Sequence, residues 1–195
     1  MGESEGRALP GREVPPAVCV IGKKKSGKTT TVVGLVAELV QRGYRVMTAK
    51  HGHHFRLDTE GTDSWRHRHE SGAVRTVLAG PEEFALTGVW GEGGEEPLES
   101  LVARYLSDAE LVIAEGFKRA PFPRIEVYRS ASHAEPIYPG GVEGADPGER
   151  PYLAILTDVP DFDAAVPVLD LHDPERFAKL ADIVEAYLQG AQTPS

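Results

Sequence analysis

Cysteine is almost absent from this 195-residue chain, which has only Cys19, and acidic residues outnumber lysine and arginine. A single cysteine cannot form an internal disulfide, and we interpret Cys19 as a small buried residue in a protein of the reducing cytoplasm. The net charge of −9 argues against a general nucleic-acid surface, since phosphate backbones require a basic face. No apolar run approaches the roughly 20 residues of a membrane span, and the first residues lack the apolar core of a signal peptide. We therefore expect no nucleic-acid partner and no membrane segment.

A glycine- and lysine-rich stretch near the N-terminal end carries the clearest chemical signal. Gly22, Gly27, Lys28 and Thr29 fit the phosphate-loop pattern G-x-x-x-x-G-K-[ST]. Such a turn aims backbone N–H groups at a polyphosphate, and side chains at the glycine positions would block the approach. Lys28 would reach the β/γ-phosphates, and the Thr29 hydroxyl would be placed to bind Mg²⁺. The lysines at 23–25 add positive charge, for which a nucleotide polyphosphate is the simplest partner.

The sequence on either side of this stretch fits the strand and helix that a phosphate loop connects. Residues 17–21 are apolar, which predicts a buried strand. Apolar residues then recur at helical spacing over 32–40, and Gly43 marks the end of the helix. The N-terminal end of that helix would point at the phosphates, where the helix dipole favours negative charge. We therefore predict that the chain binds a nucleotide.

Strands and helices alternate along the rest of the chain. Further strands are expected over 44–50, 111–114, 124–128, 153–156 and 168–171, and helices over 64–71, 97–106 and 175–188. Two short strands, 74–79 and 84–89, form a possible β-hairpin extension around Gly80-Pro81. This alternation predicts an α/β, three-layer fold of the P-loop NTPase type, with a mainly parallel sheet covered by helices on both faces.

The composition also suggests how the chain is divided. Residues 1–16 are rich in glycine, proline and charge, so we expect a flexible leader there and a short tail over 191–195. Between them we expect a single nucleotide-binding domain over 17–190. Its one long Gly/Pro-rich loop is expected over 129–151.

Two acidic residues follow predicted strands. Ligands of parallel sheets bind beyond the carboxyl ends of the strands, where Gly22, Lys50, Glu115 and Asp158 would emerge together. Glu115 follows four apolar residues, as the acid of a Walker B strand does, and could hold Mg²⁺ through a water, although that acid is Asp in the P-loop class. Asp158 could accept hydrogen bonds from a guanine base. The alternative for both is an acid that merely ends a strand.

A polar segment between the second strand and the second helix is dense in ligating side chains. Asp58 and Asp63 are candidates for outer metal ligands or for orienting an attacking water, and the alternative is an Asx-turn or a helix N-cap. His51, His53 and His54 suggest zinc, but strand alternation points His54 away from the other two and no cysteine pair completes a tetrahedral site. We favour binding of an anionic substrate, or contact with a partner, for these histidines.

Taken together, these elements resemble the molybdopterin-guanine dinucleotide biosynthesis protein MobB family over about 17–188. The resemblance is carried by the Gly22–Thr30 loop, Lys50-His51-Gly52-His53-His54, Asp58-x-x-Gly61-x-Asp63-Ser64, Glu115-Gly116-Phe117-Lys118 and Thr157-Asp158-Val159-Pro160. It implies the P-loop branch that includes dethiobiotin synthetase and the nickel-insertion GTPases. It further implies GTP and Mg²⁺ binding, at most slow GTP hydrolysis, a homodimer, and a role as adaptor to MobA, the guanylyltransferase that attaches a GMP unit to molybdopterin.

The resemblance also implies roles for individual residues. The phosphate-holding residues would be Gly22, Ser26, Gly27, Lys28, Thr29 and Thr30, with Lys23 and Lys25 in the same loop. The metal would be served by Thr29, Asp63 and Glu115. The residues facing molybdopterin or Mo-molybdopterin, its phosphate, or the partner would be Lys50, His51, His53, His54, Asp58 and Lys118. The lysines at 23–25 depart from the small residues expected there, and Lys23 has the position of a lysine that crosses the dimer in related nucleotide switches.

Two other function classes remain open on the sequence alone. One is a small-molecule kinase or ligase that uses ATP, for which Arg66, Arg68 and Arg75 could supply a lid. The other is a partner-binding module without nucleotide affinity. No residue that orients the attacking water and no arginine finger in cis is evident, and a finger is worth on the order of 10³–10⁵ in GTPase rate. Hydrolysis is therefore expected to be slow.

Overall fold

The computed structural model describes residues 14–52, 55, 58–139 and 151–191. The chain forms two compact units, Met1–His51 with Leu98–Ser195, and Gly52–Pro97. Each unit is described by itself below. Several predictions fall outside the described residues: residues 1–13 of the leader expected over 1–16, the histidines at 53 and 54, residues 140–150 of the loop expected over 129–151, and residues 192–195 of the expected tail.

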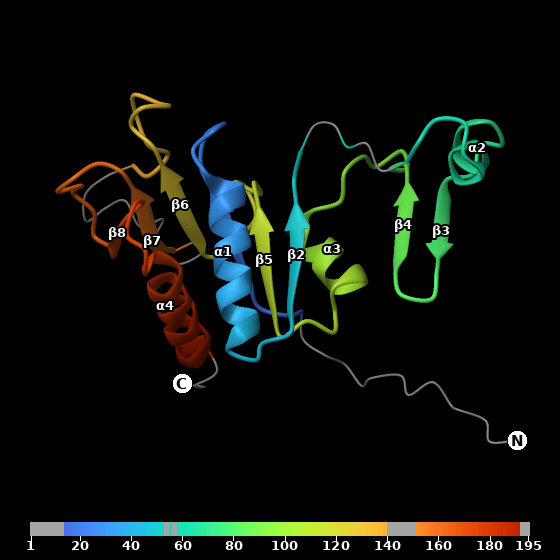
Figure 1. Ribbon diagram of the computed structural model, residues 1–195. Coiled ribbons are helices and arrows are strands. Elements are labelled where there is room, and N and C mark those ends of the chain that lie inside the picture. Colours follow the sequence, from blue (N-terminus) through green and yellow to red (C-terminus); the bar gives the residue numbers. More distant parts are fainter. Residues whose placement is uncertain (1–13, 53–54, 56–57, 140–150, 192–195) are drawn as a thin grey trace, which may run out of the picture. The chain divides into compact units, whose positions relative to one another are not determined.

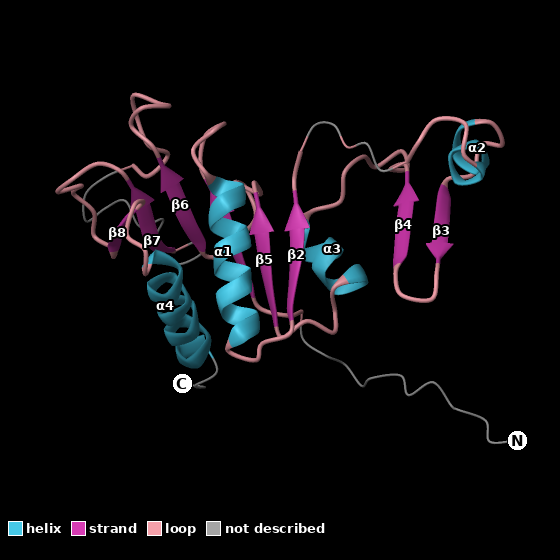
Figure 2. Ribbon diagram, in the orientation of Figure 1, coloured by secondary structure: helices cyan, strands magenta, loops and turns pink. Residues whose placement is uncertain are grey.

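The first unit is built on a six-stranded parallel sheet (Figure 1 and Figure 2). Its strands are β1 (Ala17–Ile21), β2 (Val46–Lys50), β5 (Leu111–Glu115), β6 (Arg124–Tyr128), β7 (Tyr152–Thr157) and β8 (Val168–Asp170). They lie in the order β2-β5-β1-β6-β7-β8, and every neighbouring pair is parallel. The carboxyl ends of all six strands therefore meet at one edge of the sheet, as the sequence predicted.

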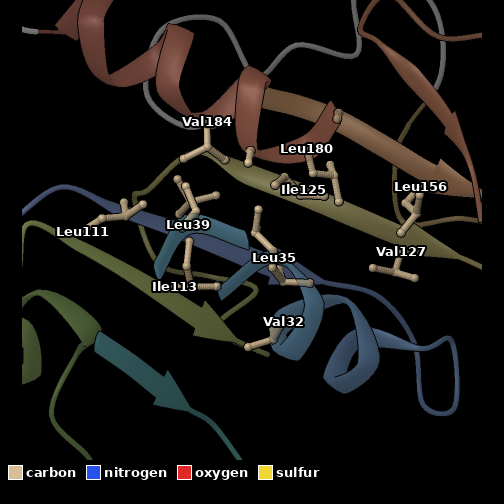
Figure 3. Close-up of a cluster of buried hydrophobic side chains, with 14 of the residues drawn as sticks. Val32, Leu35, Leu39, Leu111, Ile113, Ile125, Val127, Leu156, Leu180 and Val184 are labelled. Carbon is tan, nitrogen blue, oxygen red and sulfur yellow. The ribbon is translucent and has the colours of Figure 1, made fainter. Parts of the chain in front are cut away.

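Helices cover both faces of this sheet, because the central strands are apolar on both sides. On one face, Val18 and Val20 of β1 pack with α1 (Lys28–Gln41) and α4 (Arg176–Ala191). Figure 3 shows side chains of the same cluster, among them Leu35 of α1 and Leu180 of α4. On the other face, Cys19 and Ile21 pack with α3 (Leu98–Tyr105). The predicted three-layer α/β fold is confirmed. Cys19 is buried as predicted, and burial raises the pKa of its thiol to about 12.

Helices α1 and α4 pack closely on the same face. A Cβ built on Gly34 of α1 would lie 2.3 Å from the Phe177 ring of α4, so only glycine leaves room for that ring. At the other end of α1, Arg42 donates hydrogen bonds to Glu38 and, on α4, to Asp182 and Glu185. These contacts hold α1, and with it the loop that precedes it, against the rest of the unit.

The second unit contains α2 (Asp63–His69) and an antiparallel hairpin of β3 (Arg75–Ala79) and β4 (Phe84–Gly88). This hairpin confirms the predicted extension. Helix α2 begins after Thr62, whose side chain accepts a hydrogen bond from the Trp65 N–H and so caps the helix. None of the helices in the described part of the chain has the length and apolar character that a bilayer crossing requires.

Predicted element boundaries differ from the observed ones by a few residues. The second strand starts at Val46 and not at Tyr44, because the Tyr44 N–H donates to the Leu39 carbonyl in the turn that ends α1. The second helix starts one residue early and ends two residues early, at Asp63 and His69. The last helix continues to Ala191, three residues past its predicted end at 188.

Candidate functional site

The loop between β1 and α1 has the backbone that its glycines predict. Gly22 has φ 150°, and a Cβ there would lie 2.4 Å from the Val127 carbonyl oxygen and 2.6 Å from Ser26 Oγ. Gly27 has φ 107°, in the left-handed region, at the position that caps α1. Neither position accommodates a side chain without strain. The motif spacing thus produces a tight loop that leads directly into the N-terminal end of α1.

Two side chains of this loop, Ser26 and Lys28, lack an anionic hydrogen-bond acceptor among the described residues. Ser26 Oγ is buried and forms no hydrogen bond with the residues that the structure describes. Lys28 Nζ donates to the carbonyl of Lys23, 2.7 Å away within the same loop. Burial lowers the pKa of Lys28; the Glu115 carboxylate opposes this shift, and Lys118 and Lys50 add to it. An anion in the loop would give both Ser26 and Lys28 a better partner.

Three residues from different elements meet beside the loop. Thr29, in the first turn of α1, donates from Oγ1 to Glu115 Oε1 at 2.9 Å. Lys50, at the end of β2, lies with Nζ 3.1 Å from both carboxylate oxygens of Glu115 and 3.3 Å from Thr29 Oγ1. Lys50 pairs with Glu115 in the parallel register, which brings the two side chains together. The predicted convergence of these strand ends is therefore observed for Lys50 and Glu115.

Thr29 and Glu115 suit a hard divalent cation. Their oxygens lie 2.9 Å apart beside the loop, and the Glu115 side chain is only 10% exposed. Mg²⁺ prefers oxygen ligands, keeps several waters and is held by one or two protein groups together with phosphates. Lys50 places a positive charge on the same two oxygens, which shows that this position attracts a cation. The residues present fit Mg²⁺, which Thr29 and Glu115 would hold.

The Glu115-Gly116-Phe117-Lys118 turn packs on the end of β2. Gly116 has φ 89°, and a Cβ there would lie 3.2 Å from the His51 carbonyl oxygen. The His51 N–H donates to the Glu115 carbonyl, and the His51 ring lies 5.4 Å from the Phe117 ring. Lys118 is exposed on the same turn. His51 therefore contacts the turn that follows Glu115, and the roles of His51 and Lys118 toward a ligand or partner stay predictions.

Asp158 lies at the same edge of the sheet, after β7. Its Oδ1 accepts a hydrogen bond of 2.7 Å from the Ser130 N–H. Desolvation by burial would raise the pKa of Asp158. The hydrogen bond from Ser130 and the charge of Arg129 outweigh this effect and hold the pKa below its ordinary value. The structure therefore gives Asp158 a turn partner, and its contact with a guanine base stays a prediction.

Sequence analysis missed the segment after β6 that contacts the phosphate loop. His133 Nε2 lies 2.5 Å from the Lys24 carbonyl oxygen, and Ser132 Oγ lies 3.5 Å from that of Lys25. These residues fall in the predicted long loop, where no periodic pattern indicates which groups lie together. Only the order of β1 and β6 in the sheet brings the two segments into contact.

The remaining predicted site residues lie in the second unit or outside the described residues. Asp58 Oδ1 accepts hydrogen bonds from the Thr59 N–H and from the hydroxyls of Thr62 and Ser64, which is the Asx-turn alternative. Asp63 Oδ1 accepts from the Ser64 N–H. Their roles toward a metal stay predictions. No group of three or more ligating His, Cys, Asp or Glu side chains occurs among the described residues.

Comparison with known proteins decides the family. The family model of molybdopterin guanine dinucleotide synthesis protein B, MobB, matches residues 17–143. The chain is a member of the MobB family.

Two curated relatives, both molybdopterin-guanine dinucleotide biosynthesis adapter proteins, support this membership. The relative from Haemophilus influenzae is 34% identical over 177 residues, covering 89% of each chain. The relative from Escherichia coli is 30% identical over 187 residues, covering 93% of this chain and 98% of its own. A crystal structure of molybdopterin-guanine biosynthesis protein B aligns with TM-score 0.65 and 26% identity, over 89% of this chain and 99% of that one. The likeness to MobB thus extends over most of the chain, in fold as well as in sequence.

Proposed function

We propose that this MobB-family chain is a GTP-binding adaptor in molybdenum-cofactor biosynthesis, at the step that converts molybdopterin to molybdopterin guanine dinucleotide. It binds GTP with Mg²⁺ in the cytoplasm, hydrolyses GTP weakly, and assists a MobA-type guanylyltransferase. The observation that carries the proposal is the junction of the phosphate loop with Thr29, Glu115 and Lys50. The adapter names of its relatives support the place in the pathway.

The residues of the loop account for triphosphate binding. Backbone N–H groups at the start of α1 and the Lys28 ammonium bind the phosphate chain, and moving Lys28 from the Lys23 carbonyl to a phosphate exchanges a neutral acceptor for a charged one. Thr29 and Glu115 would hold Mg²⁺, which would neutralise phosphate charge. Lys50, His51 and Lys118 lie beside this position and face the pterin, its phosphate or the partner.

Slow hydrolysis is expected because no glutamine among the described residues lies near the metal position. Gln41, one of three glutamines in the chain, ends α1 about 20 Å from the loop, at roughly 1.5 Å per residue over its 14 residues. Gln189 lies in the last turn of α4. Neither is placed to orient a water against a phosphate at the loop. A kinase or ligase that uses ATP is the alternative.

Calorimetric titration with GTP and then ATP, each with Mg²⁺, tests the proposal. We expect GTP to bind at least about tenfold more tightly than ATP, a difference of about 1.4 kcal/mol. We expect Lys28→Ala to abolish measurable binding while its thermal unfolding stays cooperative. Tighter binding of ATP together with a phosphorylated product would favour the kinase, and no binding of either nucleotide would leave only a partner-binding module.

We also propose a homodimer, which the hairpin of the second unit supports. Val77 lies opposite Leu86, and Ala79 lies opposite Phe84, so these side chains share one face of the hairpin. These four side chains are apolar and exposed, with Phe84 80% and Val77 66% accessible, and Arg75 lies at the end of the same face. Two-stranded sheets are marginally stable alone, and an exposed apolar sheet face favours pairing with another copy.

A further inference from the structure

Arg129 is placed beside the phosphate loop by the order of the strands. It directly follows Tyr128, the last residue of β6. Strand β6 pairs with β1 in parallel register, with Ile21 opposite Glu126. Residue 129 therefore follows the end of β6, at the same carboxyl edge of the sheet as the loop that begins at Gly22.

The guanidinium of Arg129 lies against the glycine that precedes Lys28. A Cβ built on Gly27 would be 4.0 Å from Arg129 Nη2 and 3.7 Å from Val127 Cγ1. Gly27 has no side chain to screen this approach, and it caps the N-terminal end of α1. The Arg129 guanidinium therefore lies next to Gly27, at the N-terminal end of α1 where the helix dipole is positive.

One donor of the Arg129 guanidinium lacks a hydrogen-bond acceptor among the described residues. Arg129 Nε is buried and has no hydrogen-bond partner among the residues that the structure describes. The charge of Arg129 lowers the pKa of Asp158, but the Asp158 carboxylate accepts its hydrogen bond from the Ser130 N–H. A buried donor that carries charge and lacks an acceptor is costly, so such groups persist where a ligand supplies the acceptor.

A turn anchors Arg129 to the loop. The N–H groups of Ser132 and His133 both donate to the Arg129 carbonyl, at 3.0 and 3.2 Å. His133 Nε2 in turn donates to the Lys24 carbonyl at 2.5 Å. The backbone of Arg129 is therefore held beside the phosphate loop, so this part of the chain need not be ordered when a ligand binds.

We propose that Arg129 is a phosphate-binding residue supplied in cis, donating from its guanidinium to the phosphate chain of the nucleotide in the loop. The inference rests on the nucleotide binding proposed above. A planar guanidinium matches two phosphate oxygens at once, and a cation in this place neutralises charge that the loop N–H groups only partly balance. Arg129 is thus a second side-chain cation for the phosphates, in addition to Lys28.

The test compares Arg129→Gln and Arg129→Lys with the matched control Arg45→Gln. Arg45 is an exposed arginine that precedes β2, at the amino end of the strands. With Mg²⁺ in excess, we expect Arg129→Gln to weaken binding of GTP and GDP at least about tenfold in calorimetry, about 1.4 kcal/mol. Arg129→Lys should weaken it less, because the charge remains, and Arg45→Gln should leave it unchanged. The salt dependence of GTP affinity should become shallower in Arg129→Gln alone.

Each outcome decides a separate question. Wild-type affinity for GTP and GDP in Arg129→Gln would overturn the role of Arg129 while leaving nucleotide binding intact. Equal loss of affinity in Arg129→Gln and Arg129→Lys, with unchanged salt dependence, would make Arg129 a structural residue of the turn and would also overturn it. No nucleotide binding by the wild-type protein would instead remove the proposed function. If Arg129→Gln fails to unfold cooperatively, Arg129→Lys, which keeps the aliphatic stem, carries the comparison.

Discussion

At the scale of single residues, Lys50 lies where a divalent cation would bind. Its ammonium contacts Thr29 Oγ1 and both oxygens of Glu115, the two groups best suited to Mg²⁺. The Lys50 side chain is half exposed, so it can move away at little cost in burial. Metal binding and the Lys50 contacts should therefore exclude each other.

This competition predicts the effect of Lys50→Met. Removing the ammonium should strengthen binding of Mn²⁺, used as a probe for Mg²⁺, several-fold in the protein saturated with GDP. Electron paramagnetic resonance of free Mn²⁺ measures the affinity. Arg119→Met removes the same charge from an exposed position four residues after Glu115 in the chain and should have little effect. Weaker Mn²⁺ binding in Lys50→Met would mean that Lys50 holds Glu115 in place for the metal.

At the scale of elements, the contact of α1 with α4 depends on one glycine. Glycine inside a helix normally costs about 1 kcal/mol relative to alanine, so Gly34→Ala would stabilise an isolated α1. Here the added methyl would lie 2.3–2.5 Å from three carbons of the Phe177 ring. The half-buried Phe177 ring would have to leave its place against α1, and its packing there would be lost.

We therefore expect Gly34→Ala to lower the free energy of unfolding by about 1–3 kcal/mol in urea denaturation. The double variant Gly34→Ala with Phe177→Ala should lose less than the sum of the two single changes, because it removes the clash. Gly190→Ala is the control, since a Cβ there has open space. A more stable Gly34→Ala protein would show that helix propensity outweighs the packing.

At the scale of the whole molecule, the exposed hairpin face of the second unit should govern self-association. Val77→Glu places a charge in the centre of that face, opposite Leu86. If the face joins two copies, sedimentation should show a dimer for the wild type and a shift toward monomer for Val77→Glu. Val40→Glu, on a similarly exposed valine at the end of α1, should not change the mass. A monomeric wild type would remove the homodimer from the proposal.

Much of the first unit could be predicted from residue patterns. Continuous apolar runs such as 111–114 marked strands buried on both faces, and the glycine spacing in 22–29 described the phosphate loop. These features are local, because each depends on residues within one turn or one strand. Strand β6 is an instructive case, since all five residues are buried although Arg124 and Glu126 are charged. Glu126 accepts two backbone N–H groups, from Ile137 and Tyr138, and no local pattern indicates this.

The sequence by itself determined the phosphate loop, the alternation of strands and helices, and the resemblance to the MobB family, because glycine conformation and apolar periodicity act over a few neighbouring residues. Only the tertiary structure decided which groups meet at the sheet edge. Thr29 and Glu115 are 86 positions apart and Arg129 follows Gly27 by about 100, yet parallel pairing of β1 with β5 and β6 brings them together. Such contacts depend on the order of the strands in the sheet. Hydrogen bonding between distant segments sets that order, so no short stretch of sequence determines it.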